Sequence, residues 1–206
     1  MLTSQHSENH LPIMEYFYTI QGEGFHSGRP AFFIRLSGCD VGCVWCDVKE
    51  SWDINDQQYM SIDVLLQEIQ KTKADFIVIT GGEPLMHNLS TLSKKLKELN
   101  KTIAIETSGT YPSKGIIDWF CFSPKKFRKP LEEAYAMANE LKIIINHKSD
   151  FDWALEHAKK VNDKCHLFLQ PEWSKEHKHL PEIIDFIKEH PEWRISLQTH
   201  KYINIP

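Results

Sequence analysis

Short apolar runs alternate with amphipathic stretches along most of the chain, and the two patterns predict different secondary structures. The apolar runs span four to seven residues and are rich in β-branched and aromatic side chains, which is typical of buried strands. We therefore predict strands at residues 31–36, 76–80, 102–106, 116–122, 141–145, 166–169 and 195–198.

Apolar residues recur at helical spacing between these strands. Ile62, Leu65 and Ile69 form the clearest stripe, and Ser61 before them is a residue type that caps helix N-termini. Further helices are predicted within residues 89–99, 130–141, 153–158 and 181–187. The strand–helix–strand order predicts an α/β fold of parallel strands with right-handed crossovers, either a partial barrel or an open doubly wound sheet.

Polar segments, most of which contain glycine or proline, follow most of the predicted strands. They lie at residues 37–39, 80–84, 106–110, 123–126, 170–172 and 198–201. In parallel α/β architectures the carboxyl ends of the strands gather on one rim, and ligands bind there. The sequence therefore predicts one pocket that all of these segments border.

The composition fits a single domain over residues 1–206, in which residues 1–12 are expected to be loose. A hydrophobic content of 41% suffices for a core at this length. The formal net charge of -4 gives no electrostatic case for nucleic acid, and no apolar run approaches the roughly 20 residues that span a bilayer. With no recognisable export signal, the chain is expected in the cytoplasm.

Three of the five cysteines, Cys39, Cys43 and Cys46, follow the first predicted strand with the spacing C-x3-C-x2-C. Three thiolates hold three corners of an iron–sulfur cube and leave one iron open to a small molecule, whereas electron-transfer clusters usually take four cysteines. A structural zinc site is the alternative, but zinc prefers four ligands and the nearest upstream histidine is His26. The odd number of cysteines disfavours disulfides.

The cysteine loop is followed, after the next predicted strand, by Gly81-Gly82-Glu83-Pro84. This combination resembles the radical S-adenosylmethionine (SAM) superfamily. The resemblance implies a partial (β/α) barrel, a [4Fe-4S] cluster on the three cysteines, and SAM bound at the open iron and cleaved to a 5′-deoxyadenosyl radical. It also places Gly82 and Glu83 at the methionine end of the cofactor.

A narrower resemblance covers almost the whole chain. Segments that resemble the 7-carboxy-7-deazaguanine synthase family lie at residues 19–24, 28–31, 33–39, 46–47, 106–110, 123–125, 170–171 and 198–206. That family converts 6-carboxy-5,6,7,8-tetrahydropterin to 7-carboxy-7-deazaguanine with release of ammonia, in queuosine and 7-deazapurine biosynthesis. The resemblance further implies a homodimer, an external electron donor similar to flavodoxin or ferredoxin, and help from magnesium.

The resemblance assigns site residues position by position. The substrate-binding positions are Ile20, Gln21, Gly22, Glu23, Arg35, Thr80, His200 and Pro206. The cofactor-binding positions, besides Gly82 and Glu83, are Ser108, Ser123, Pro124, Lys125 and Gln170. The residue types suit these roles, because Gln and Glu match the donors and acceptors of a pterin edge and an arginine guanidinium clamps a carboxylate through two parallel hydrogen bonds.

One position departs from the family. The residue after Cys46-Asp47 is typically Thr or Ser, whose hydroxyl binds magnesium, but here it is Val48, which offers no oxygen. Two other functions stay open on the sequence: an activase for glycyl-radical enzymes, of the same superfamily, and a zinc-stabilised binding module. The activase acts on a protein backbone, and the segments 21–24 and 198–201 argue against it.

Overall fold

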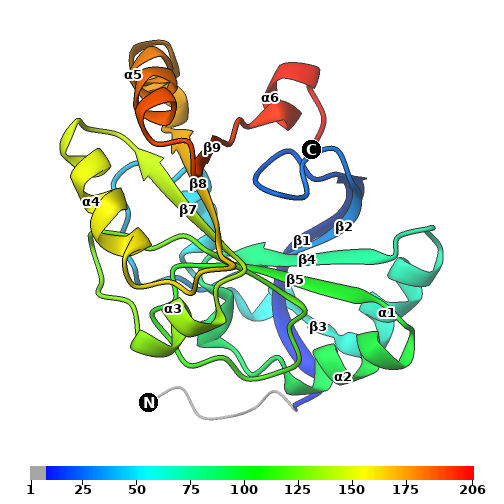
Figure 1. Ribbon diagram of the computed structural model, residues 1–206. Helices are drawn as coiled ribbons and strands as arrows, with labels where there is room; N and C mark the ends of the chain where they lie inside the picture. Colours follow the sequence, from blue (N-terminus) through cyan, green and yellow to red (C-terminus); the bar gives the residue numbers. More distant parts are fainter. Residues whose placement is uncertain (1–7) are drawn as a thin grey trace.

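The computed structural model describes residues 8–206, which form a curved sheet covered by helices on its outer side (Figure 1). Within these residues the nine strands lie in the order β3-β1-β2-β4-β5-β6-β7-β8-β9. Their bounds are β1 (His10–Ile20), β2 (Pro30–Leu36), β3 (Tyr59–Ser61), β4 (Phe76–Gly81), β5 (Thr102–Thr107), β6 (Trp119–Phe122), β7 (Glu140–Ile145), β8 (His166–Pro171) and β9 (Trp193–Ile195).

From β2 onward each strand runs parallel to its neighbour in the sheet, whereas β1 is antiparallel to both β2 and β3. The edge strands β3 and β9 do not pair with each other, so the barrel is partial and stays open. This confirms the predicted α/β fold of parallel strands, and it decides between the two architectures that the sequence left open.

The helices follow the strands along the chain, as the alternation predicted. They are α1 (Ile62–Gln70), α2 (Ser90–Glu98), α3 (Glu132–Met137), α4 (Ser149–Ala158), α5 (Glu176–Glu189) and α6 (Thr199–Ile203). Helix α1 begins where the sequence predicted, because the Ser61 hydroxyl accepts a hydrogen bond from the amide of Asp63. Helix α5 begins before Pro181, which lies inside it. No helix among residues 8–206 is long and apolar enough to cross a bilayer.

Part of the N-terminal segment that was expected to be loose lies outside the described residues, and the rest is ordered. Residues 10–12 belong to β1, where Leu11 is 5% exposed and pairs with Met60 of β3. The backbone ladder and the buried leucine hold this stretch in place. The expectation of a loose segment is therefore wrong for these residues.

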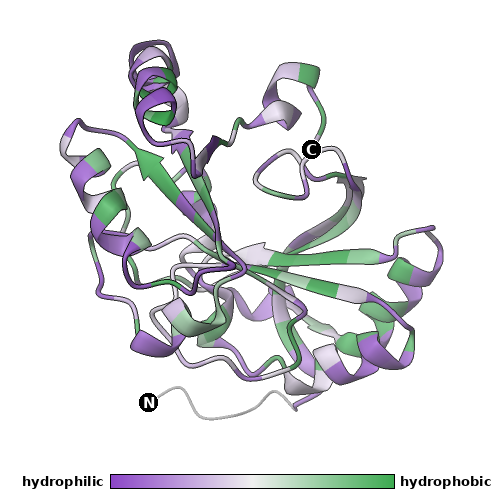
Figure 2. Ribbon diagram, in the orientation of Figure 1, coloured by the Kyte–Doolittle hydropathy of each residue, from purple (hydrophilic) through white to green (hydrophobic). Residues whose placement is uncertain are grey.

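The two faces of the sheet have different compositions, because successive side chains of a strand point to opposite sides. Residues such as Ile77, Ile79 and Ile105 face the helices and form the main core, which Figure 2 shows as green strands beneath helices with purple outer faces. The inner face holds only a small apolar cluster near the amino ends of the strands, which contains Ala31, Phe76, Val78 and Ala104. Polar side chains occupy the inner face at the carboxyl ends, and the pocket opens there.

Candidate active site

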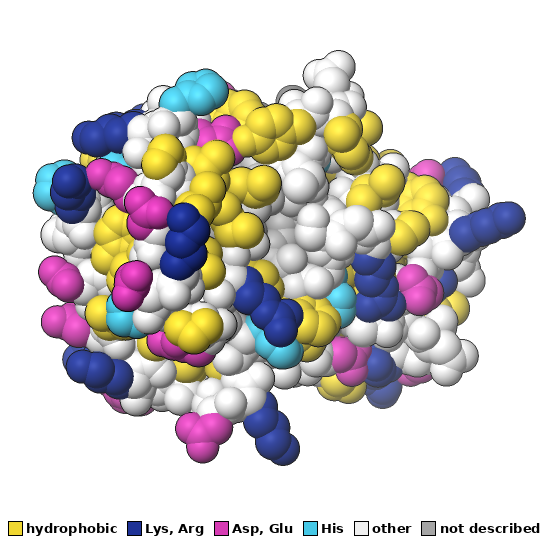
Figure 3. Space-filling model, turned by 45° about the horizontal axis from the view of Figure 1, so that its top comes forward, with side chains coloured by type: hydrophobic (Ala, Val, Ile, Leu, Met, Phe, Trp, Pro, Cys, Tyr) yellow, Lys and Arg dark blue, Asp and Glu magenta, His cyan; other side chains and the backbone are white. Residues whose placement is uncertain are grey.

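A cavity of about 280 Å³ lies inside the partial barrel, at the carboxyl ends of the parallel strands. The surface is hollowed near the middle of the face shown in Figure 3, with hydrophobic side chains beside the hollow. The cavity lining includes these positions singled out in the sequence: Ile20, Gln21, Gly22, Glu23, Arg35, Cys39, Cys43, Cys46, Val48, Thr80, Gly82, Glu83, Ser108, Ser123, Lys125, Gln170, His200 and Pro206. Pro124 is buried and does not border the cavity, so the structure does not support the predicted contact of this residue with the cofactor.

The cysteine loop is held by backbone contacts to the segment that follows β4. The amide of Glu83 donates to the carbonyl of Gly38 (2.8 Å), and the amide of Gly82 donates to the carbonyl of Leu36 (2.9 Å). A Cβ atom on Gly82 would lie 2.2 Å from the carbonyl oxygen of Gly38, so only glycine allows this approach. The Gly-Gly-Glu segment therefore fixes the start of the loop that carries the cysteines.

Burial dominates the electrostatics of two of the three thiols, Cys39 and Cys43. Burial raises the pKa of Cys43 to about 11, with smaller contributions from Cys46 and Cys39, while the Lys125 ammonium opposes the shift. Burial is also the main cause that raises the pKa of Cys39, and the charges of Glu83 and Cys46 add to it. Thiols with raised pKa values lose their protons when a metal binds them.

The three cysteines border one cavity, as the ligands of an iron–sulfur cluster with an open iron would. Across residues 8–206, no three His, Cys, Asp or Glu side chains gather as ligands around one point. An iron–sulfur cube places each cysteine on a different iron, so its ligands need not converge as those of tetrahedral zinc must. Cys39, Cys43 and Cys46 all border the cavity, which leaves space beside them for a small molecule.

Glu83 is 1% exposed, and its carboxylate is already saturated by donors of the chain. One oxygen accepts hydrogen bonds from the Leu85 amide (3.0 Å) and the Thr107 hydroxyl (2.5 Å). The other accepts from the Ser108 amide (2.8 Å) and the Ser108 hydroxyl (2.5 Å). A carboxylate offers about four acceptor positions. Glu83 thus ties the loop after β4 to the end of β5, and its carboxylate has no free acceptor for a ligand.

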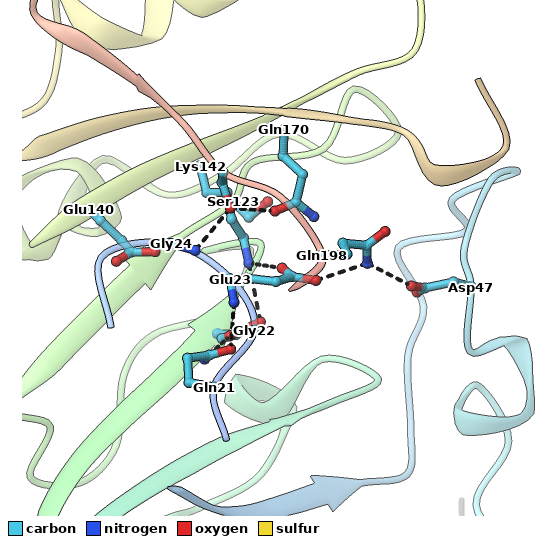
Figure 4. A network of polar contacts seen from close by, with 12 residues as sticks. Gln21, Gly22, Glu23, Gly24, Asp47, Ser123, Glu140, Lys142, Gln170 and Gln198 are labelled. Carbon is cyan, nitrogen blue, oxygen red and sulfur yellow. Dashed lines mark hydrogen bonds and ion pairs between the residues drawn. The ribbon is translucent and has the colours of Figure 1, made fainter. Parts of the chain in front are cut away.

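A charged network forms the base of the cavity (Figure 4). The Lys142 side chain is only 4% exposed, and its ammonium contacts Glu23 (2.5 Å) and Glu106 (3.4 Å). Gln21 donates to the other oxygen of Glu106 (2.9 Å), and Gln198 donates to the other oxygen of Glu23 (2.9 Å). Strands β5 and β7, the loop after β1 and the segment before α6 therefore meet at one point.

The network holds the Glu23 carboxylate in its ionised form. Burial alone would raise the pKa of Glu23, but the charge and hydrogen bond of Lys142, together with the hydrogen bond from Gln198, outweigh it and lower the pKa to about 2. Burial also acts to lower the pKa of Lys142, yet Glu106 and Glu23 raise it well above its ordinary value. At neutral pH the base of the cavity therefore holds the ionised Glu23 carboxylate beside the Lys142 cation.

In the sequence, Glu106 and Gln198 were expected near the site only as members of the segments 106–110 and 198–206, and Lys142 was not among the predicted site residues. The available signal was the lysine itself, because Lys142 interrupts an otherwise apolar run predicted as a buried strand. Lysine is almost never buried without a partner. Its partners lie 119 and 36 residues away in the chain, so spacing did not identify them.

The C-terminal segment returns to the cavity, as the resemblance implied. Both the amide and the hydroxyl of Thr199 donate to the carbonyl of Gly22 (3.0 and 2.9 Å). A Cβ atom on Gly22 would lie 2.3 Å from Nδ1 of His200, so this contact requires glycine. His200, which belongs to α6, and Pro206, which follows that helix, both border the cavity. Burial is the main reason why the pKa of His200 is lowered.

Arg35 also borders the cavity, on the inner face of β2. Its Nε donates to Glu15 of β1 (2.6 Å), and its side chain is 19% exposed. A guanidinium has five N–H donors, so this ion pair orients the side chain and leaves donors for a second anion.

The cavity does not build a site for magnesium from its side chains. Val48 borders the cavity and presents only methyl groups. The neighbouring Asp47 carboxylate faces the Lys201 ammonium and the Gln198 amide, each at 3.4 Å. The expectation of a magnesium ion is therefore not supported by the residues present.

Comparisons with known proteins show which proteins this chain resembles. The model of the radical SAM superfamily matches residues 33–169. A 7-carboxy-7-deazaguanine synthase from Flavobacterium psychrophilum is 55% identical over 95% of this chain and 93% of its own length, and one from a Synechocystis species is 47% identical over 94% and 93%. The crystal structure of QueE from Escherichia coli superposes with a TM-score of 0.83 at 32% identity, and covers 91% of this chain and 93% of that one.

Proposed function

The chain belongs to the 7-carboxy-7-deazaguanine synthase family of the radical SAM superfamily, and on that premise we propose that it converts 6-carboxy-5,6,7,8-tetrahydropterin to 7-carboxy-7-deazaguanine and ammonia. The observation that carries the proposal is that the cysteine loop and the Glu23–Lys142–Glu106 network border the same cavity. Neither the activase nor the zinc module has support in the comparisons.

The network suits the polar edge of a pterin. The 2-amino-pyrimidinone edge of that ring presents N–H donors, and the carboxylates of Glu23 and Glu106 are acceptors that border the cavity. In a cavity shielded from water such bonds discriminate strongly, because a ligand without the matching donors leaves buried carboxylates unpaired. Gln21, Gly22 and Ile20 border the same part, and Thr80, His200 and Pro206 complete the proposed substrate contacts.

The cofactors are assigned to the side chains next to the cysteine loop and at the ends of β5, β6 and β8. The thiols of Cys39, Cys43 and Cys46 hold the [4Fe-4S] cluster in this proposal, and Gly82, Ser108, Ser123, Lys125 and Gln170 bind SAM. When bound, the two groups supply the hydrogen-abstracting radical chemistry of the superfamily. The chain's own residues bind and orient the substrate, and the tail around His200 excludes water. Lys125 donates to the Ser123 hydroxyl (2.6 Å), which fixes a cation beside Cys43.

The finer parts of the proposal are inherited from the family. They are a homodimer, a reducing compartment that keeps the cysteines free, and an external electron donor. All five cysteines are free thiols. The proposed function includes no magnesium ion, because Val48 stands at the cavity where the family typically has a hydroxyl ligand.

The test is direct turnover. Protein reconstituted anaerobically with iron and sulfide is mixed with SAM, dithionite and 6-carboxy-5,6,7,8-tetrahydropterin, with no other protein present. We expect 7-carboxy-7-deazaguanine by mass spectrometry and ammonia in equal amount. Cluster-loaded protein that cleaves SAM but leaves the pterin unchanged would refute the proposed substrate.

Arg35→Ala is expected to raise the KM for the pterin roughly 30- to 100-fold, the equivalent of about 2–3 kcal/mol for a lost charge-assisted pair. SAM cleavage without substrate should stay within about twofold of the wild type. The physical reason is that the remaining guanidinium donors of Arg35 are assigned to the carboxylate at carbon 6.

Glu15→Ala is the matched control, because it breaks the same ion pair and keeps the arginine. It is expected to change KM by less than about fivefold. Equal effects of the two substitutions would mean that Arg35 serves only its pairing with Glu15.

A further inference from the structure

Ser196 is a buried residue that lies behind the wall of the cavity. It directly follows β9, and its amide donates to the carbonyl of Leu169 (2.8 Å), which continues the parallel pairing of β9 with β8. Ser196 is 2% exposed and does not border the cavity. The register of the two strands therefore sets its side chain beside Gln170, the residue after Leu169.

The Ser196 hydroxyl joins two parts of the proposed site. It accepts a hydrogen bond from the amide of Gly24 (2.9 Å) and donates one to Oε1 of Gln170 (2.7 Å). Gly24 follows Glu23, a proposed acceptor for the pterin, and Gln170 is a proposed contact of SAM. A single buried oxygen atom thus links the backbone beside the substrate contact to the side chain of the cofactor contact.

The bond to Gln170 determines which end of its amide faces the cavity. Gln170 borders the cavity and is 3% exposed. Its oxygen is held by Ser196, whereas its nitrogen points the other way and makes no hydrogen bond with any residue from 8 to 206 (Figure 4). An amide nitrogen offers two donors, which match the hydroxyl and carboxylate oxygens of SAM. Without the Ser196 hydroxyl, the amide loses the contact that keeps its nitrogen on the cavity side.

The bond to Gly24 fixes the backbone that follows Glu23. On the preceding side, the carbonyl of Gly22 accepts hydrogen bonds from the amide and the hydroxyl of Thr199. Glu23 therefore lies between two backbone contacts, and both are made by the segment that follows β9. Because its carboxylate reaches the cavity from this fixed position, loss of the Ser196 contact shifts the acceptor that is offered to the pterin.

We propose that Ser196 is a positioning residue that sets SAM and the pterin relative to each other. The inference rests on the proposed function, which requires both ligands in one cavity. Hydrogen abstraction needs the reacting atoms about 3–3.5 Å apart, so a small shift of either ligand separates them. Loss of the Ser196 hydroxyl therefore weakens the binding of both ligands and releases more 5′-deoxyadenosine without product.

The experiment compares Ser196→Ala with a matched control, Ser93→Ala. Ser93 is a buried serine of α2 that does not border the cavity. Its hydroxyl also accepts from a backbone amide, that of Ile116 (2.9 Å), and donates to an oxygen, the carbonyl of Ser90 (3.2 Å). The control therefore removes the same kinds of hydrogen bond away from the site.

Ligand affinity, coupling and backbone exchange separate positioning from stability. In reconstituted protein, Ser196→Ala is expected to raise the Kd for SAM, measured by calorimetric titration, and the KM for the pterin each about fivefold. The 5′-deoxyadenosine released per molecule of 7-carboxy-7-deazaguanine should rise at least about threefold. In cluster-free protein, hydrogen exchange followed by mass spectrometry should be faster in the peptide that contains Gly24. Ser93→Ala should match the wild type in all of these.

Gln170→Glu tests the orientation of the amide separately. It keeps an oxygen for the Ser196 hydroxyl and puts an acceptor where the donor nitrogen faces the cavity. The Kd for SAM is therefore expected to rise at least about tenfold. A wild-type Kd in this variant would contradict the assigned orientation.

The inference is overturned if Ser196→Ala keeps the wild-type Kd for SAM and the wild-type ratio of 5′-deoxyadenosine to product, or if Ser93→Ala changes both equally. Failure of the proposed function would look different, because the wild type itself would then make no product. The Kd for SAM and the exchange at Gly24 would still be measurable in that case.

Discussion

Cys43→Ser is expected to abolish product formation and to lower the iron and sulfide content of reconstituted protein to a small fraction of the wild-type values. Cys43 is 8% exposed and borders the cavity between the two other cysteines in the chain. With one of three protein ligands replaced, the cube is held at only two corners, and a serine hydroxyl is a poor substitute for a thiolate on iron.

Iron and sulfide analysis, the visible absorbance of the cluster and the turnover assay measure these effects together. Cys165→Ser is the matched control, because Cys165 is half-buried beside the main core and away from the cavity. Burial raises the pKa of Cys165 to about 12, so it stays a neutral thiol. Its substitution should cost at most about 1–2 kcal/mol of stability and leave iron content and turnover unchanged. Full activity of Cys43→Ser would contradict the assignment of the cluster to this loop.

The location of the site could be predicted from the sequence because it depends on local signals. The cysteine spacing and the Gly81–Gly82 pair each occupy a few consecutive residues, and both follow apolar runs that are easily recognised as strands. The rule that parallel strands end on one rim then brings these segments together without any knowledge of side-chain packing. The same rule placed Gln170 and Ser123 at the cavity, where the structure has them.

What the sequence did not predict depends on which way a side chain points. The strands were expected to be apolar on both faces, but Glu106 and Lys142 lie on the inner face next to Ile105 and Ile143, which belong to the main core. Pro124 stands between two cavity residues in the chain, yet it is buried and does not border the cavity. Strand β1 was missed because Pro12 interrupts its run and an irregularity between Ile13 and Glu15 breaks the alternation that marks a strand.

Glu83 shows a second kind of limit. Its position in the motif suggested a direct contact with a ligand, yet the structure has four donors of the chain around its carboxylate. Hydrogen bonds from Thr107 and Ser108, which lie 24 and 25 residues away, are not visible in a short motif. A motif residue can therefore act by fixing the loop that binds the ligand.

Lys142→Met is expected to lower the free energy of unfolding by about 3 kcal/mol, because it leaves the partly buried carboxylates of Glu23 and Glu106 without their cation. For a chain of this length the melting temperature should fall by roughly 10 °C. Methionine has nearly the length of lysine, so loss of packing is small and loss of charge dominates.

The Lys142→Met substitution should also change how the free energy of unfolding depends on pH. In the wild type the pKa of Glu23 is about 2 in the folded state, below its ordinary value of 4.5. A depressed pKa contributes stability that is fully present above pH 4.5 and is lost as the pH falls from there toward 2. Without Lys142, burial remains as the largest effect on Glu23 and raises its pKa, so the variant should gain stability relative to neutral pH when Glu23 is protonated.

Thermal melts of cluster-free protein between about pH 3 and 8 measure both effects. Lys188→Met is the matched control, because its ammonium pairs with the exposed Asp185 at 3.2 Å, away from the cavity, and it should cost less than about 1 kcal/mol. Adding Glu23→Gln to Lys142→Met should restore part of the lost stability, since it removes one of the two unpaired charges. If Lys142→Met melted like the wild type across this pH range, the ion pair with Lys142 would not hold Glu23 ionised, and the proposed recognition of the pterin edge would lose that acceptor.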